Sequence, residues 1–148
     1  VLAYICKRNL KEKTLAIIMP DTEITPKSET EDAMKMISSP VKTVCMGMCA
    51  SMGAMLLSQG EKGKREMWSH GRVMIHQPSL GGYFQATSAD IEIQAEQIRK
   101  TKELGAQILA KNCNKSMEQI MADFDRDYWM NAKEAVEYGI VDKIAKSL

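Results

Sequence analysis

Short apolar runs recur along the chain and predict buried β-strands. Residues 14–19 and 41–46 are the clearest, because each is a mostly apolar run next to a proline. Residues 72–75 read RVMI and predict another strand, with a shorter one at 66–68 and a last one that starts at residue 140. Nearly continuous apolar strands are typical of a parallel sheet that is covered on both faces.

Segments with apolar residues at helical spacing separate these strands. Ser28 opens a capping box with Glu31, and Pro40, Gly60 and Gly139 each stop a helix. The predicted helices are one that begins at the capping box, one over residues 51–58, a long one over 88–112, and two that follow the N-caps Ser116 and Asn131. This alternation predicts the α/β class: a largely parallel sheet, flanking helices and one projecting long helix.

Composition limits the classes of function. The 148 residues are expected to form a single domain, 1–148, short or truncated at its N-terminus because the chain starts in mid-pattern without Met. The 20 basic and 19 acidic residues give a net charge of +1, which argues against nucleic-acid binding. We find no apolar run long enough for a membrane span and no signal-peptide pattern.

The cysteines indicate a reducing compartment. The chain has four of them and no CxxC pair, so reduced thiols are the simplest interpretation. A zinc site from Cys45, Cys49 and the two histidines has poor spacing. We therefore expect a soluble protein of the bacterial cytoplasm, an organelle matrix or the plastid stroma.

Ser51 is the first candidate for chemistry, because it lies where a predicted strand turns into a predicted helix. From the local pattern an N-cap is the commoner explanation. The alternative is a nucleophile, with the N–H of Met52 at the helix start as an oxyanion donor. The surrounding letters, MGMCASMGA, do not form the G-x-S-x-G elbow.

A nucleophilic serine needs a base and an orienting acid. Of the two histidines, His70 is in an expected turn, whereas His76 ends a predicted strand, at the edge where a site would form; a surface histidine there is equally common. The acid would come from the three aspartates of ADFDRDYW. Asp127 is expected nearest the core, because aromatic residues follow it.

Three blocks resemble the ClpP family of self-compartmentalised serine peptidases: GMCASMGAMLLSQGEKGKR, RVMIHQP and DRDYWMNAKEAVEYGIVD. The resemblance runs from about residue 14 to 144 and implies the ClpP/crotonase fold. It assigns Ser51 as nucleophile, His76 as general base, Asp127 as orienting acid and Met52 as an oxyanion donor. The separation of 76 − 51 = 25 residues also fits the family.

The resemblance further implies how such a protein works. Unfolded polypeptides would be cut to short peptides inside two stacked heptameric rings, a tetradecamer of this chain or of homologous subunits. A ring-shaped AAA+ Clp ATPase would supply substrate and use ATP, so this chain would need no cofactor. The helix 88–112 matches the family's handle between rings, and Leu80, Gly81 and Gly82 match its substrate-binding edge.

One departure weakens the resemblance. The family usually carries S-P-G-G after the first buried strand, and this chain has Met-Pro-Asp21-Thr22. Thr22 takes the place of a glycine that donates to the oxyanion, and threonine disfavours positive φ. The sequence therefore allows a working peptidase or a weakly active structural subunit of a mixed ring. An acyl-CoA-handling enzyme on the related crotonase fold is a third possibility, less favoured because such enzymes do not need these three residues.

Overall fold

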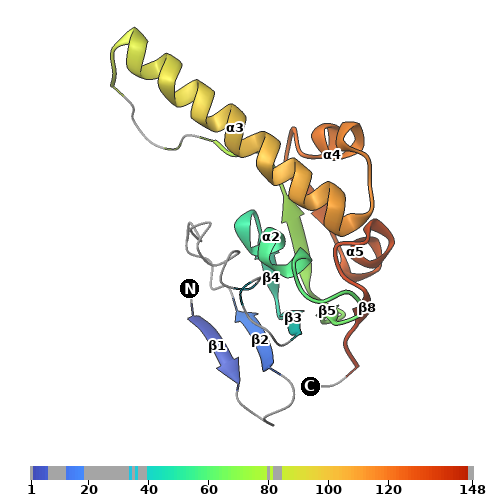
Figure 1. Cartoon of the computed structure of the whole chain (residues 1–148). Helices are drawn as coiled ribbons and strands as arrows, with labels where there is room; N and C mark the ends of the chain where they lie inside the picture. The colour runs from blue at the N-terminus through green and yellow to red at the C-terminus, as the bar shows by residue number, and fades with distance from the viewer. Residues whose placement is uncertain are drawn as a thin grey trace.

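The computed structural model describes residues 2–6, 13–18, 34, 36, 40–79, 81 and 85–146. Strands and helices are interspersed along this length (Figure 1). The strands are β1 (Leu2–Cys6), β2 (Lys13–Ile18), β3 (Val41–Cys45), β4 (Met48–Ala50), β5 (Arg65–Met67), β6 (Arg72–Ile75), β7 (Tyr128–Met130) and β8 (Lys143–Ile144). The helices are α2 (Met52–Ser58), α3 (Ser88–Cys113), α4 (Met117–Asp123) and α5 (Ala132–Tyr138).

The larger sheet has the strand order β1-β2-β3-β5-β8. Strands β2, β3, β5 and β8 pair in parallel, and β1 adds antiparallel to β2. Buried side chains fill most of β3 and all of β5, as expected for strands covered on both faces. The predicted α/β class with a largely parallel sheet and flanking helices is confirmed.

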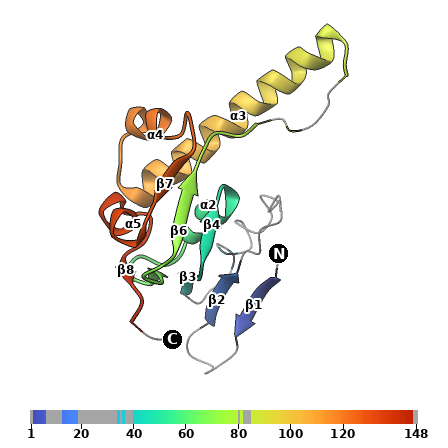
Figure 2. The same cartoon turned by 180° about the vertical axis from the view of Figure 1, so that it is seen from behind.

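A second sheet of three strands, β4-β6-β7, creates the edge on which the candidate residues lie. Strand β6 pairs in parallel with β4 and antiparallel with β7, and Figure 2 shows β7 lying beside β6. In this register Ala50 lies opposite Met74, and Ile75 lies opposite Tyr128. Ser51 follows β4, His76 follows β6 and Asp127 precedes β7. These three residues therefore meet at one edge of the sheet.

Helix α2 follows β4 directly and is almost entirely buried. Together with α3, α4 and α5 it covers the main apolar core. The fully buried members with the largest side chains include Leu57, Met67, Ile75, Leu109, Ile120, Met130 and Ile140. The edge that carries residues 51, 76 and 127 thus rests on a packed base.

Helix α3 runs along the body at its C-terminal end and projects beyond it at its N-terminal end (Figure 1). Only Ala106, Leu109 and Cys113 of its 26 residues are buried. A capping box between Thr87 and Asp90 fixes its start. The predicted helix over 88–112 therefore agrees with the structure to within one residue.

Several elements differ from the sequence prediction. Strands β1, β4 and β7 were not expected, and so neither was the second sheet. The terminal strand begins at Lys143, whereas Ile140 and Val141 are buried in the turn after α5. Most of the first predicted helix, including the Ser28 capping box, lies outside the described residues, although Met34 and Met36 are helical.

Candidate active site

Ser51, His76 and Asp127 converge in the structure. The Ser51 Oγ lies 3.0 Å from His76 Nε2, and Asp127 Oδ1 lies 3.1 Å from His76 Nδ1. Both distances are satisfied when the imidazole carries its proton on Nδ1, so that it donates to Asp127 and accepts the Ser51 hydroxyl at Nε2. The side chains are therefore arranged as nucleophile, base and orienting acid would be.

The backbone of Ser51 has a conformation that serine rarely adopts, with φ 55° and ψ −120°. Its N–H donates to Met74 O at 2.9 Å, and its carbonyl accepts from Ala54 N at 3.0 Å. Its side chain makes no capping hydrogen bond, so the N-cap explanation of this serine is wrong. Such a backbone costs about 1–3 kcal/mol, and here it accompanies a hydroxyl that reaches His76 rather than α2.

Met52 is the first residue of α2 and directly follows Ser51. The first N–H groups of a helix have no acceptor inside that helix. The Met52 N–H is therefore one of the donors at the helix start beside the Ser51 hydroxyl, where partial positive charge gathers. This position suits the expected oxyanion donor.

Asp127 is more exposed than its aromatic neighbours suggested. Its side chain is 59% exposed, and Tyr128 and Trp129 are each 39% exposed. The expectation that Asp127 lies nearest the core is wrong, because β7 is an edge strand and only Met130 of it is buried. The aromatic rings instead pack sideways, Tyr128 against Tyr138 and Trp129 under the guanidinium of Arg72.

The three aspartates of this segment have different partners. Asp123 accepts from the Tyr138 hydroxyl at 2.8 Å, and Asp125 accepts from the Gln77 amide. Only Asp127 reaches His76. His70 is exposed in a turn, as expected, which leaves His76 as the histidine that contacts Ser51.

Two of the buried thiols, Cys49 and Cys113, do not compete with Ser51 as nucleophiles. Cys49 lies two residues before Ser51 but is fully buried, and its hydrogen bond with Cys45 and its burial both raise its pKa. Burial also raises the pKa of Cys113 to about 11. Both thiols are therefore protonated near neutral pH.

The zinc hypothesis gains no support from the part of the chain that the structure describes. Within it, His, Cys, Asp and Glu side chains form no group of three that could hold a metal ion. In the same part, no helix is both long enough and apolar enough to cross a membrane.

Four predicted site residues fall in parts of the chain that the structure does not describe. Asp21, Thr22, Leu80 and Gly82 lie outside the described residues. Gly81 is described and exposed, and a Cβ atom added there would meet nothing within 4 Å. The predicted substrate-binding edge and the second oxyanion donor therefore stay predictions.

Sequence reasoning overlooked Gln77. Its side chain and backbone connect the end of β6 with the turn that precedes Asp127. The available signal was its place in the HQP block, directly after the histidine.

Comparison with known proteins identifies the family. A family model described as Clp protease matches residues 7–147, nearly the whole chain. The matched region includes Ser51, His76 and Asp127 and both sheets from β2 onward. The chain therefore belongs to the Clp protease family of serine peptidases.

Proposed function

We propose that this chain is a proteolytic subunit in which Ser51 is the nucleophile, His76 the general base and Asp127 the orienting acid. The observation that carries the proposal is the 3.0 Å approach of Ser51 Oγ to His76 Nε2, made from a backbone conformation that costs free energy. A strained serine that does not cap its helix needs another reason to be there, and nucleophilic attack supplies it.

The proposed reaction has two halves. His76 Nε2 takes the hydroxyl proton while Ser51 Oγ bonds to the carbonyl carbon of the substrate, and the carbonyl electrons move to the oxygen, which the Met52 N–H stabilises. The C–N bond then breaks as His76 returns the proton to the leaving amine. Water repeats the sequence on the resulting ester and frees Ser51. General-base help of this kind contributes roughly a hundredfold to ten-thousandfold.

Asp127 holds the imidazole in the tautomer that leaves Nε2 free to accept a proton. Its 3.1 Å contact with Nδ1 also places a negative charge beside the imidazolium that forms during attack. Because Asp127 is 59% exposed, its orientation depends on neighbouring contacts rather than on burial.

Clp protease family members generally form oligomeric rings with Clp ATPases. We infer that this chain likewise builds heptameric rings, stacked as a tetradecamer, with α3 between the rings. Its substrates would be unfolded polypeptides that an AAA+ ATPase delivers. The ATPase would consume ATP, and the chain itself would need no cofactor.

The alternative is a structural subunit with little activity. Asp21 and Thr22 favour it, because an added carboxylate and a threonine replace two glycines at the expected second oxyanion donor. Losing one such donor typically costs about 3 kcal/mol of transition-state stabilisation. The 3.0 Å contact of Ser51 with His76 favours the active subunit.

One labelling experiment decides between the two. We expect a fluorophosphonate probe to form an adduct on Ser51 of the intact protein, and Ser51→Ala to abolish both the adduct and the turnover of a short fluorogenic peptide. Ser69→Ala, in an exposed turn, is the matched control and should leave both unchanged. A folded protein without any adduct on Ser51 would leave the structural subunit as the better proposal.

A further inference from the structure

Gln77 connects the two chain segments that carry His76 and Asp127. Its backbone N–H donates to Phe124 O at 2.6 Å. Its side-chain Nε2 donates to the backbone oxygen of Asp125 at 2.8 Å and to the Asp125 carboxylate at 3.2 Å. These three hydrogen bonds therefore join the residue that follows His76 to Phe124 and Asp125, which lie three and two residues before Asp127.

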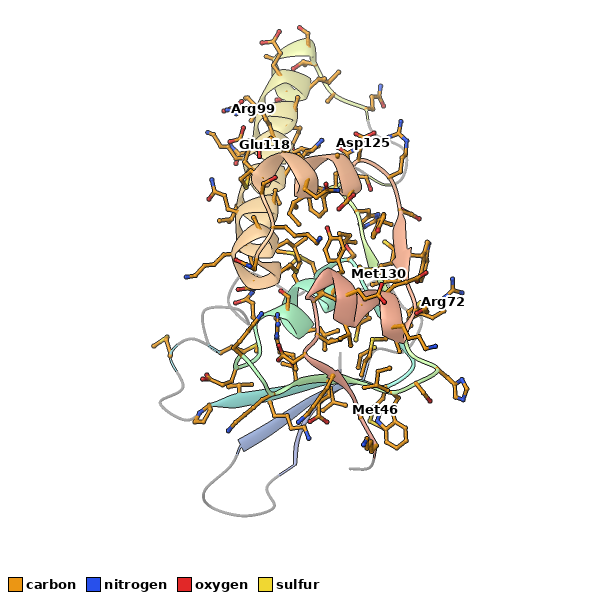
Figure 3. The ribbon with its side chains drawn as sticks, turned by 90° about the vertical axis from the view of Figure 1, so that its right-hand side faces the viewer. Met46, Arg72, Arg99, Glu118, Asp125 and Met130 are labelled. Carbon is orange, nitrogen blue, oxygen red and sulfur yellow. The ribbon has the colours of Figure 1, made fainter. Side chains whose placement is uncertain are left out.

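Lys102 of α3 fixes the orientation of the Gln77 amide. The Lys102 Nζ donates to Gln77 Oε1 at 2.8 Å and lies 4.0 Å from the Asp125 carboxylate. Because an ammonium group can only donate, Oε1 must face Lys102 and Nε2 must face Asp125. Figure 3 shows Asp125 where the chain leaves α4, which crosses α3, and descends toward Met130 in β7.

The proposed catalytic contact needs such a support. The His76 and Asp127 side chains are 28% and 59% exposed, so water competes for the hydrogen bond between them. A hydrogen bond for which water competes contributes only about 0.5–1.5 kcal/mol and fixes little by itself. A misplacement of about 1 Å in an active site can cost a hundredfold in rate. The backbone hydrogen bond from Gln77 to Phe124 and the side-chain bonds to Asp125 add three further links between the same two segments.

We propose that Gln77 is a positioning residue for Ser51, His76 and Asp127, and that Lys102 orients its amide. This inference rests on the proposed function, because a positioning role needs a reaction to serve. In this proposal Lys102 of α3 affects the site through Gln77, without contacting the proposed catalytic residues itself.

Two substitutions of Gln77 test the role in the assembled protein. Gln77→Leu removes the donor and the acceptor, whereas Gln77→Glu keeps the shape and still accepts from Lys102 but faces the Asp125 carboxylate with an oxygen. We expect each to lower kcat for a short fluorogenic peptide roughly tenfold to a hundredfold, with KM changed less than about twofold. Gln119→Leu is the matched control, because Gln119 also donates to an aspartate, Asp123 at 2.8 Å, but within α4.

Substitutions of Lys102 test the same role from the other side. Lys102→Met should lower kcat in the same direction, and Lys102→Arg, which keeps a charged donor, should recover most of it. Lys100→Met is the matched control, since Lys100 lies on the same helix and contacts Glu96, 3.5 Å away. Circular dichroism and the thermal midpoint show that each variant is folded. A lower kcat in variants that these two measurements show to be fully folded, together with recovery by arginine, is a result that simple loss of fold would not produce.

The outcomes separate the two proposals. Unchanged kcat in folded Gln77→Leu and Lys102→Met would overturn the positioning role and leave the peptidase intact. Equal loss in the Gln119→Leu and Lys100→Met controls would also overturn it. Absence of turnover and of Ser51 labelling in the unsubstituted protein would overturn the proposed function, and the positioning role with it.

Discussion

At the residue scale, an ion pair between buried Arg65 and partly buried Asp142 reinforces the pairing of β5 with β8. Arg65 is 1% exposed, and its guanidinium contacts Asp142 at 2.6 Å and 3.0 Å. Its remaining Nη1 donates to Asn112 O at 2.9 Å, at the C-terminal end of α3. The pair thus joins β5, α3 and the turn before β8, and removing one partner would leave a buried charge without compensation.

Asp142→Asn should therefore destabilise the protein by about 3 to 5 kcal/mol near neutral pH. Burial alone would raise the pKa of Asp142, but hydrogen bonds from Arg65 and Gly63 hold it below its ordinary value. A lowered pKa gives stability that is present above the unfolded pKa of about 4 and is lost as the pH falls through the folded pKa. The difference in free energy of unfolding between wild type and Asp142→Asn should therefore become smaller below about pH 4.

Urea unfolding at fixed protein concentration, repeated across pH, measures this difference. Glu137→Gln, which removes an exposed carboxylate of α5, is the control and should change stability little at any pH. If the difference in free energy of unfolding between wild type and Asp142→Asn stays constant down to pH 3, protonation of Asp142 does not account for the lost stability.

Single residues also show how far the sequence could predict the site. With two histidines in the chain, the choice of base was nearly forced, and the convergence of Ser51, His76 and Asp127 followed from strand ends and family blocks. The positive φ of Ser51 and the exposure of Asp127 could not be predicted. Both depend on the second sheet, whose register places these residues at a common edge.

At the element scale, the end of α5 depends on how closely it approaches α3. Gly139 has φ 90°, and a Cβ atom there would lie 2.8 Å from the backbone oxygen of Cys113. Gly63 has nearly the same φ, 86°, with nothing within 4 Å. The two glycines therefore separate backbone strain from crowding.

Gly63→Ala should cost about 1–2 kcal/mol, the price of a left-handed backbone for an L-residue. Gly139→Ala should cost roughly 1–3 kcal/mol more, because backbone atoms of α3 must shift to admit the methyl group. The midpoints of thermal unfolding, converted to free energies, measure both losses. If both variants lose the same free energy of unfolding, the backbone of α3 can shift to admit the methyl group at residue 139 without destabilising the protein.

The elements also differ in how well local patterns predict them. The long helix α3 and the caps at Ser116 and Asn131 were predicted within a residue or so, because caps and helical periodicity are local signals. Strands β4 and β7 have three residues each, too few to show a period, and their pairing partners are far away in sequence. Such strands are defined by long-range register, which a single sequence does not show.

At the scale of the whole molecule, α3 leaves apolar side chains uncovered on two faces. Ile91 lies 7 residues before Ile98, and Ile98 lies 11 residues before buried Leu109. Both separations are close to a whole number of helical turns, so Ile91 and Ile98 extend the face of α3 that packs on the core. Ile93 and Leu104, also 11 residues apart, lie on a different face. Ile91, Ile93 and Leu104 are 51%, 58% and 55% exposed.

Soluble monomers rarely expose large apolar patches. Because α3 has two uncovered apolar faces, we predict that other subunits contact it from both sides in an assembly. Ile91→Glu and Leu104→Glu, one on each face, should each shift the protein toward smaller species in sedimentation velocity at micromolar concentration. Gln94→Glu adds the same charge to the projecting part without removing an apolar side chain, and should leave the assembly unchanged. If Leu104→Glu alone disrupts the assembly, only one face of α3 is used. A folded, unsubstituted protein that sediments as a monomer would contradict the ring itself, and the exposed face of α3 would then need a different partner.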